Sequence, residues 1–504
     1  MSSRLEAPYL LSESARLECD ALIIGTGAGG ASIASKLVNA GLDVLMAEEG
    51  PYVPASEAPA GLGASTLNMW RGGGLLSTLY PSQIAYAEGC CVGGGTEINS
   101  AIFQRAPESV LENWAIANHL RDFLSPSLSP YYERAAEAVN ALVTDADVGP
   151  PTTIIARAGE AMGWKVASLE RGQRRCVGAN MCAAGCPTGG KQSMSSTLLP
   201  RAMTAGARLV ARCRVHRLLM HDSRATAAIA TATDADGFRH VITISASHVF
   251  LCAGTMQTPL LIRRSGIRSR VGRRFQLHPT MRVLARFPEP INAHRFRLPL
   301  AAITEFMPDV RFGGSIFTLA TYAMALGEDW NRRSHWLPDY AHHAMYYAMI
   351  KPDGEGRIFG VPGTTNPLVS YALTERDWRR LGEAMRKLSM ALIAAGAKCV
   401  MPSIRGHDGW ATADAIRRED ATRIPQDRAL LMSIHLFGSC PMGEGSELFP
   451  VDSFGRLIGT ENIVVADGSV LPGAPGVNPQ ATIMALAFRA ADAFLDRRRS
   501  RCGT

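Results

Sequence analysis

Three regularly spaced cysteines are the residues of this chain whose spacing most directly suggests chemistry. Cys176, Cys182 and Cys186 form the pattern C-x5-C-x3-C, and Pro187 follows the last of them. The bacterial ferredoxin pattern is C-x2-C-x2-C-x3-C-P. When it is laid on this stretch, the cysteines fill its first, third and fourth places, and the second place falls on Ala179. A cluster that needs three thiolates, such as a 3Fe-4S cluster, would suit this arrangement.

Other interpretations of this cysteine-rich loop, residues 176–190, stay open. The thiols could be structural parts of a glycine-rich loop, form one disulfide, or bind zinc with a fourth ligand elsewhere in the chain. The chain has 11 cysteines in 504 residues, and without a secretory signal this favours free thiols or metal ligands over a disulfide framework. No electron-accepting partner is visible in the sequence, which favours a loop without a cluster.

A glycine-rich turn near the N-terminus has the spacing of a dinucleotide-binding site. The segment "ALIIGTGAGGASIASKLVNAGLDVLMAEE" indicates a buried strand, a turn, a helix and a second strand. Gly25 permits the tight turn, Gly27 lets the backbone approach a pyrophosphate, and Gly30 lets the helix pack closely on the strand. The phosphates would lie at the helix N-terminus. Glu48, at the end of the second strand, would accept hydrogen bonds from the ribose hydroxyls.

The composition is that of a large globular protein, with 47% hydrophobic and 19% charged residues. The net charge is +7, and part of the excess lies in residues 263–274 and 496–501. We interpret these runs as solvated surface, because nucleic-acid binding would need a basic face with aromatic partners. No apolar run is long enough to cross a bilayer, and the first residues lack the pattern of a secretory signal. We expect a cytoplasmic protein that binds no nucleic acid and has no membrane span.

Strand, turn and helix signals recur along the chain and predict an α/β fold. Residues 1–282 and 429–504 are expected to form a discontinuous Rossmann-type nucleotide domain, a parallel sheet with helices that includes the cysteine-rich loop. Residues 283–428 contain aromatic, Met- and His-rich segments with strand-like runs. They are expected to form a sheet-based α+β substrate domain.

Five motifs in order resemble those of the glucose–methanol–choline (GMC) family of FAD-dependent alcohol oxidases and dehydrogenases. They are "IIGTGAGGASIASKL", "VGGGTEINSAI", "CAGTMQTPLLIRRSG", "SIHLFGSCPMG" and "VVADGSVLPGAPGVNPQATIMALAFRAAD". The motifs cover both ends and the middle of the chain, whereas the substrate domain carries no such match. The resemblance implies the family's fold, its FAD cofactor and its action on alcohols.

The resemblance also implies which residues contact FAD. Some family members attach FAD covalently through a histidine in the glycine-rich loop, and Ile98 stands at that position here. We therefore expect non-covalent FAD. The implied contacts, from the ADP half through the adenine and diphosphate to the flavin ring, are Gly25, Thr26, Gly27, Ala28, Gly30, Glu48, Val215, Gly93, Gly94, Asn99, Gly254, Asp467, Gly468, Asn478 and Pro479.

Alcohol oxidation needs a base for the hydroxyl proton and an acceptor for the hydride. His435, in "SIHLFGSCPMG", stands at the family's catalytic histidine position and is expected to take the proton. Asn478 stands at the partner position, cannot titrate, and is expected to hold and polarise the substrate oxygen. The hydride would pass to flavin N5, giving an aldehyde or ketone. His278 is interpreted as structural.

Substrate and electron acceptor are less defined. Glu97, beside the expected flavin edge, would either bind a cationic or polyhydroxyl substrate or serve as a hydrogen-bonded structural acid. A sugar, glycoside or aminosugar alcohol is the first expectation, from Glu97 and a resemblance to sugar dehydrogenases. A long-chain or sterol alcohol is the second, from the apolar substrate region and a resemblance to long-chain alcohol oxidases.

The electron acceptor is expected to be oxygen or an external carrier. The cysteine spacing resembles bacterial FAD glucose dehydrogenases with a 3Fe-4S cluster, and a cluster would imply a dehydrogenase. A lyase like the hydroxynitrile-lyase branch stays open. A non-catalytic scaffold conflicts with the retained His435 and Asn478.

Overall fold

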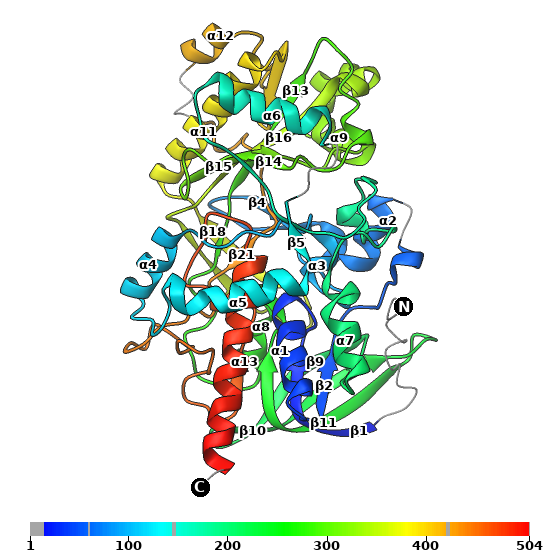
Figure 1. The fold of residues 1–504 in the computed structure, drawn as a ribbon, viewed down its shortest axis with the longest axis vertical. Helices are drawn as coiled ribbons and strands as arrows, with labels where there is room; N and C mark the ends of the chain where they lie inside the picture. The colour runs from blue at the N-terminus through cyan, green and yellow to red at the C-terminus, as the bar shows by residue number, and fades with distance from the viewer. Residues whose placement is uncertain (1–14, 59–60, 144–147, 420–423, 503–504) are drawn as a thin grey trace.

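Two large β-sheets organise the chain, one toward each end of its long axis (Figure 1). The computed structural model describes residues 15–58, 61–143, 148–419 and 424–502. The first sheet has seven strands and the second has nine. Each sheet has its own core of buried apolar side chains.

The seven-stranded sheet has the order β8–β2–β1–β11–β10–β9, with β22 also paired to β11. Its centre is parallel, as the sequence predicts, because β1 runs parallel to β2 and β11. Strand β10 is antiparallel to β9 and β11, since short turns join these three strands. The strands are β1 (Ala15–Ile24), β2 (Val44–Ala47), β8 (Arg208–Val210), β9 (Cys213–His221), β10 (Arg224–Thr233), β11 (Arg239–Leu251) and β22 (Ile463–Val465).

Helices α1, α5 and α13 lie together on one face of this sheet (Figure 1). Helix α1 packs against α13 and α7, and α13 packs against α5. The strand, turn and helix expected near the N-terminus are confirmed by β1 and α1, and strands β11 and β22 are likewise followed by helices α8 and α13. These helices are α1 (Ala28–Asn39), α5 (Ser125–Ala138), α7 (Leu198–Thr204), α8 (Gly254–Arg264) and α13 (Gln480–Cys502).

The nine-stranded sheet has the order β3–β4–β20–β13–β16–β15–β14–β6, with β19 also paired to β13. Its pairs are antiparallel except for β4 with β20, so it fits the expected α+β architecture. Helix α11 packs on β16 and β13 and contacts α6. The elements are β3 (Leu76–Ser77), β4 (Ile84–Tyr86), β6 (Val166–Ser168), β13 (Thr280–Arg286), β14 (Ala301–Ile303), β15 (Val310–Gly314), β16 (His343–Ile350), β19 (Cys399–Pro402), β20 (Leu431–Ser433), α6 (Gly149–Ala161) and α11 (Glu375–Ala394).

The second sheet also collects strands from outside residues 283–428, namely β3, β4, β6 and β20. The expected domain boundaries at residues 282 and 428 stay a prediction. Among the described residues, three two-stranded pairs complete the strands, and short helices fill the connections. They are β5 (Ala141–Leu142), β7 (Arg171–Gly172), β12 (Gln276–Leu277), β17 (Glu355–Phe359), β18 (Leu368–Ala372), β21 (Leu436–Phe437), α2 (Leu62–Met69), α3 (Gly95–Ile98), α4 (Glu108–Ala117), α9 (Leu319–Gly327), α10 (Trp330–Arg333) and α12 (Ala413–Arg418).

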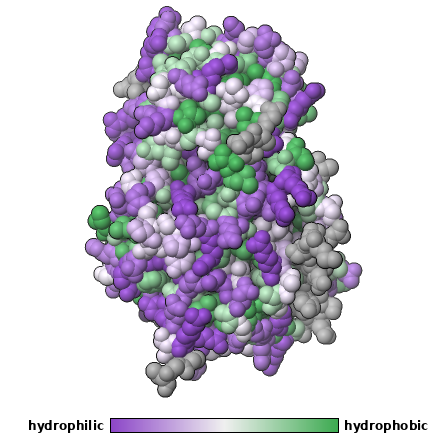
Figure 2. All heavy atoms as spheres, viewed as in Figure 1, coloured by the Kyte–Doolittle hydropathy of each residue, from purple (hydrophilic) through white to green (hydrophobic). Residues whose placement is uncertain are grey.

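Polar side chains cover most of the face seen in Figure 2, and apolar ones form small groups among them. None of the helices in the described part of the chain has both the length and the hydropathy that crossing a bilayer requires.

The start of α1 approaches the loop after β22 so closely that a side chain would not fit. A Cβ placed on Gly29 would lie 1.7 Å from the carbonyl oxygen of Ala466. Gly63, on an exposed turn of α2, has no neighbouring atom within 4 Å of such a Cβ.

Gly29→Ala is expected to lower the free energy of unfolding by about 1–3 kcal/mol, since the backbones must move apart. Gly63→Ala is the matched control and is expected to raise it by about 0.5–1 kcal/mol. Urea unfolding followed by tryptophan fluorescence measures both. Equal midpoints for Gly29→Ala and the wild type would show that α1 does not need this close approach.

Candidate functional site

A cavity of about 550 Å³ is lined by residues from both sheets. At one end are the turn after β1 and the start of α1. At the other are Met345, Tyr347 and Met349, which alternate along β16. Of the predicted site residues, the cavity brings together Gly25, Thr26, Gly27, Ala28, Glu48, Gly94, Asn99, Val215, Gly254, His435, Asp467, Gly468, Asn478 and Pro479.

The glycine-rich turn leaves space beside the N-terminus of α1. Gly25 has φ +101°, and a Cβ there would lie 2.2 Å from the carbonyl oxygen of Cys252, so the turn requires glycine. Gly27 is the N-cap residue of α1. The nearest atom to a Cβ on Gly27 would be the Gly94 Cα, at 4.0 Å. A diphosphate could therefore approach the free N–H groups at this helix end.

Thr26 and Glu48 connect the first glycine-rich turn to the second. Glu48 Oε2 accepts hydrogen bonds from the Thr26 backbone N, at 2.9 Å, and from Thr26 Oγ1, at 2.7 Å. The Gly93 N–H donates to Thr26 Oγ1 over 3.0 Å. Burial raises the pKa of Glu48, opposed by the bonds from Thr26. This network fixes the carboxyl group where the sequence predicts a ribose contact.

Asp467 connects the third and fifth motifs. Its Oδ2 accepts hydrogen bonds from the Gly254 N, at 2.9 Å, and from Thr258 Oγ1, at 2.5 Å, both in α8. Its Oδ1 accepts from the Ser469 N at 2.8 Å. Burial raises the pKa of Asp467. Loops that follow β11 and β22 thus meet at one carboxyl group.

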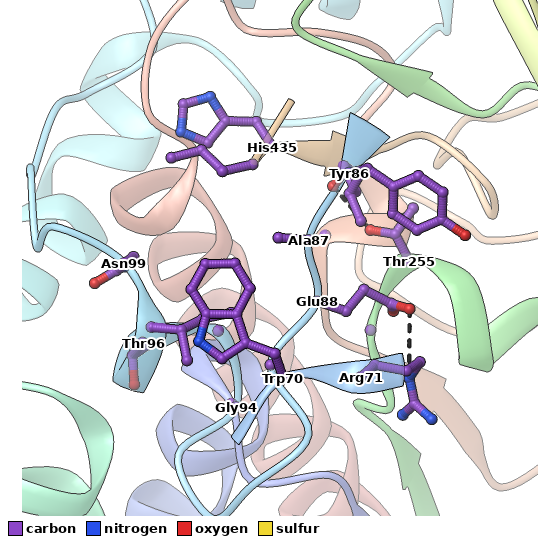
Figure 3. Close-up of a pocket in the computed structure, with 18 of the residues that line it drawn as sticks. Trp70, Arg71, Tyr86, Ala87, Glu88, Gly94, Thr96, Asn99, Thr255 and His435 are labelled. Atoms are coloured by element: carbon purple, nitrogen blue, oxygen red, sulfur yellow. Dashed lines mark hydrogen bonds and ion pairs between the residues drawn. The ribbon is translucent and has the colours of Figure 1, made fainter. Parts of the chain in front are cut away.

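A charged network beside these loops was not found from the sequence. Arg71 forms a two-pronged ion pair with Glu49 and lies 3.3 Å from Glu88, and this contact is drawn in Figure 3. Arg214, next to Val215, also pairs with Glu49. Burial raises the pKa of Glu88 to about 7 despite Arg71. No motif marked these residues, because they come from separate segments.

His435 lies across the pocket from Gly94 and Arg71 (Figure 3). Its Nε2 is 3.0 Å from Asn478 Nδ2, and its Nδ1 is 3.0 Å from His278 Nδ1. Burial, followed by the positive charge of Arg311, lowers the pKa of His435 to about 3. The imidazole is therefore neutral at physiological pH.

His278, interpreted from the sequence as structural, is in direct contact with His435. It is fully buried, and its Nε2 accepts a hydrogen bond from the Gly476 N–H at 3.0 Å. Burial, His435 and nearby cations lower the pKa of His278 well below its usual range. No local pattern marks this pairing, because the two histidines are 157 positions apart.

Three predicted contacts lie behind the cavity wall. Gly30 packs beneath the turn, where a Cβ would lie 2.0 Å from the Gly25 carbonyl oxygen. Gly93 binds Thr26, as described above. Glu97 is buried and accepts a hydrogen bond from the Ser195 N at 3.2 Å. This geometry supports the structural interpretation of Glu97 over a substrate contact.

The cysteine-rich loop shows no cluster site among the described residues. Cys182 Sγ lies 3.2 Å from Arg171 Nη2, and Cys186 Sγ accepts from the Lys191 backbone N at 3.3 Å. Cys176, Cys182 and Cys186 all have free thiols. Within the described ranges, no group of three or more His, Cys, Asp or Glu side chains could hold a metal ion. Cys182 and Cys186 thus contact different partners, and the structure gives no support to the 3Fe-4S, zinc or disulfide interpretation.

Lys191 connects this loop to the wall of the cavity through hydrogen bonds. Its Nζ donates to the carbonyl oxygens of Glu97, Asn99 and Cys182, at 2.5, 3.2 and 2.7 Å. The Asn99 side chain in turn donates to Gln480 Oε1, at the start of α13. The loop therefore supports the second glycine-rich turn.

Comparison with known proteins identifies the family. Two family models described as GMC oxidoreductase match residues 66–280 and 360–487. An uncharacterized GMC-type oxidoreductase of Sinorhizobium fredii is 49% identical over 97% of both chains. The chain belongs to the GMC oxidoreductase family. It is thus an FAD-dependent oxidoreductase, as the five motifs imply.

The chain is more distantly similar to proteins named as oxidases. A long-chain-alcohol oxidase of Arabidopsis thaliana is 25% identical, over 94% of this chain and 66% of its own length. The solved structure of pyridoxine 4-oxidase from Mesorbium loti has a TM-score of 0.71 and 17% identity, covering 95% of this chain and 99% of the other. This structural likeness confirms the fold.

The cavity of this GMC oxidoreductase fits FAD. Open space beside Gly27 and Gly254 admits a diphosphate, and no atom lies within 4 Å of a Cβ placed on Gly254. Glu48 lies at the end of β2, where a ribose would be held. His435 and Asn478 line the other end, where the reaction would occur.

Thr26→Val is expected to weaken FAD binding about tenfold, because the valine keeps the shape but removes the two hydrogen bonds of the hydroxyl group, to Glu48 and from the Gly93 N–H. Titration of the apoprotein with FAD, followed by flavin fluorescence, measures the Kd. Thr226→Val is the control. Its hydroxyl is exposed and donates to the Leu219 carbonyl oxygen, away from the cavity. Equal Kd values for Thr26→Val and the wild type would contradict the bridging role.

Proposed function

We propose that this GMC oxidoreductase oxidises the hydroxyl group of a small-molecule alcohol, with His435 as the base. The observation that carries the proposal is the 3.0 Å contact between His435 Nε2 and Asn478 Nδ2 on the cavity wall. An alcohol oxygen in the cavity, next to both nitrogens, would accept a hydrogen bond from Asn478 and give its proton to His435. Asn478 has no titratable group, so His435 is the base of the pair.

Bound FAD supplies the acceptor for the hydride, so the proton and the hydride leave the alcohol separately. The residues proposed to hold it are those that line the nucleotide end, including Thr26, Gly27, Glu48 and Asp467. We propose non-covalent binding, because Ile98 stands where some relatives carry the linking histidine. Oxygen or an external carrier is the proposed electron acceptor.

The cavity wall near His435 supports an alcohol carried on an apolar group, the second of the two substrate classes expected from the sequence. The side chains there are mostly apolar, and Glu97, on which the sugar expectation partly rested, does not line the cavity. Relatives named as long-chain-alcohol oxidases agree with this choice. The apolar lining residues are Leu298, Ile316, Met324, Met345, Met349, Met432 and Ile434.

The test is reduction of the bound flavin by alcohols without oxygen, followed by loss of its visible absorbance. Aliphatic alcohols of increasing chain length are expected to reduce it, and sugars are expected to react poorly. His435→Gln is expected to slow reduction about 10²- to 10⁴-fold. His221→Ala, which changes an exposed histidine, is the control. Absence of bleaching by every alcohol, together with cleavage of a hydroxynitrile, would replace this proposal with a lyase.

The pH dependence of flavin reduction gives a separate prediction. Because the pKa of His435 is lowered to about 3, its neutral form persists well below the usual histidine range. The reduction rate at saturating alcohol is therefore expected to stay level from pH 8 down to pH 5. Stopped-flow absorbance measures it. A fall centred near pH 6.5 would show that the working base titrates like an exposed histidine.

A further inference from the structure

Arg311 is a buried cation beside the reactive pair. It lies on β15, is fully buried, and its Nη1 donates to Asn478 Oδ1 over 2.7 Å. Its Nε and Nη2 have no hydrogen-bond partner among the residues that the structure describes. An unpaired buried charge is costly to a protein, so a compensating negative charge is expected during function.

Other arginines on or near this sheet have carboxylate partners. Arg282 on β13 and the buried Arg333 both pair with Glu328, and Arg286 pairs with Asp339 at 2.8 Å. The charged groups that act on the two histidines are Arg311 and Lys351, both cations. The region around His435 therefore has an excess of positive charge.

Arg311 also fixes the orientation of Asn478. A guanidinium group can only donate hydrogen bonds, so the amide oxygen must face it. The amide nitrogen then points at His435 Nε2. Without Arg311, the amide could turn over and present its oxygen to the cavity.

We propose that Arg311 is a positioning residue, which makes the His435–Asn478 pair a binding site for a negatively charged oxygen. The inference rests on the proposed function. When the O–H bond breaks, the proton bonds to His435 Nε2 and the electron pair stays on oxygen as an alkoxide. This oxygen accepts hydrogen bonds from His435 and Asn478. The positive charge of Arg311, which contacts Asn478, stabilises the negative charge on the oxygen. A carboxylate on an apolar chain also presents a negatively charged oxygen that can accept these hydrogen bonds.

The probe is sodium hexanoate, titrated into oxidised, FAD-loaded protein without alcohol and followed by the shift in flavin absorbance. Arg311→Met is expected to raise its Kd about 10- to 100-fold, through loss of the charge and of the amide orientation. Arg311→Lys retains the charge and is expected to restore part of the affinity. Arg286→Met removes a paired arginine from the same sheet and is expected to change the Kd less than about twofold.

Asn478→Asp provides a second test if Arg311→Met does not fold. The new carboxylate would pair with Arg311 and cancel its charge, so FAD is expected to stay bound while hexanoate binding is lost. Equal hexanoate affinity in wild type and either variant would overturn the inference, as would no hexanoate binding by the wild type.

The inference and the proposed function can fail separately. Arg311-dependent hexanoate binding without flavin reduction by any alcohol would overturn the proposed function but support the oxyanion site. Flavin reduction by alcohols with Arg311-independent hexanoate binding would overturn the inference alone.

Discussion

The hydrogen bonds that meet at Thr26 are the interaction on which the rest of the site depends. One hydroxyl group accepts from the second glycine-rich turn and donates to Glu48, so two segments far apart in sequence share one buried contact. Asp467 does the same for the loops after β11 and β22. Since these groups are buried, any one left without its partners would carry the full cost of desolvation. The cavity keeps its shape because the buried polar groups in its walls form hydrogen bonds with one another.

The parts of this structure that depend on residues close together in the chain could be predicted from the sequence. A tight turn that needs glycine, a helix that begins at Gly27 and an acid at the end of β2 are all set by neighbouring residues. For the same reason the strands and helices around the five motifs lie where their patterns predict. The resemblance to GMC motifs adds the expectation that His435 and Asn478 are the reactive pair, which composition and spacing alone do not indicate.

The long-range parts could not be predicted. Arg311 and Asn478 are 167 positions apart, and no local pattern marks an arginine in a strand as the partner of an asparagine before a helix. The second sheet likewise gathers short strands from both ends of the chain, and runs of two or three residues give no periodicity to detect. The role of the cysteines could not be predicted from their spacing for a related reason. Spacing gives the distance along the chain, whereas the direction of each thiol depends on the backbone, here turned at Gly185 (φ +90°) and Cys186 (φ +52°).

The position of β22 has a consequence for the order of folding. It pairs with β11 in register Val249 to Ile463, so the first sheet is completed by a strand that follows the whole second sheet in the chain. Pairing across such a separation is slow, because the loop between the strands must be ordered first. We expect the early βαβ unit to form quickly but to remain an incomplete nucleotide site. The loop of Asp467 and the segment of Asn478 both follow β22, so cofactor binding and catalytic competence should be acquired together, in the last steps of folding.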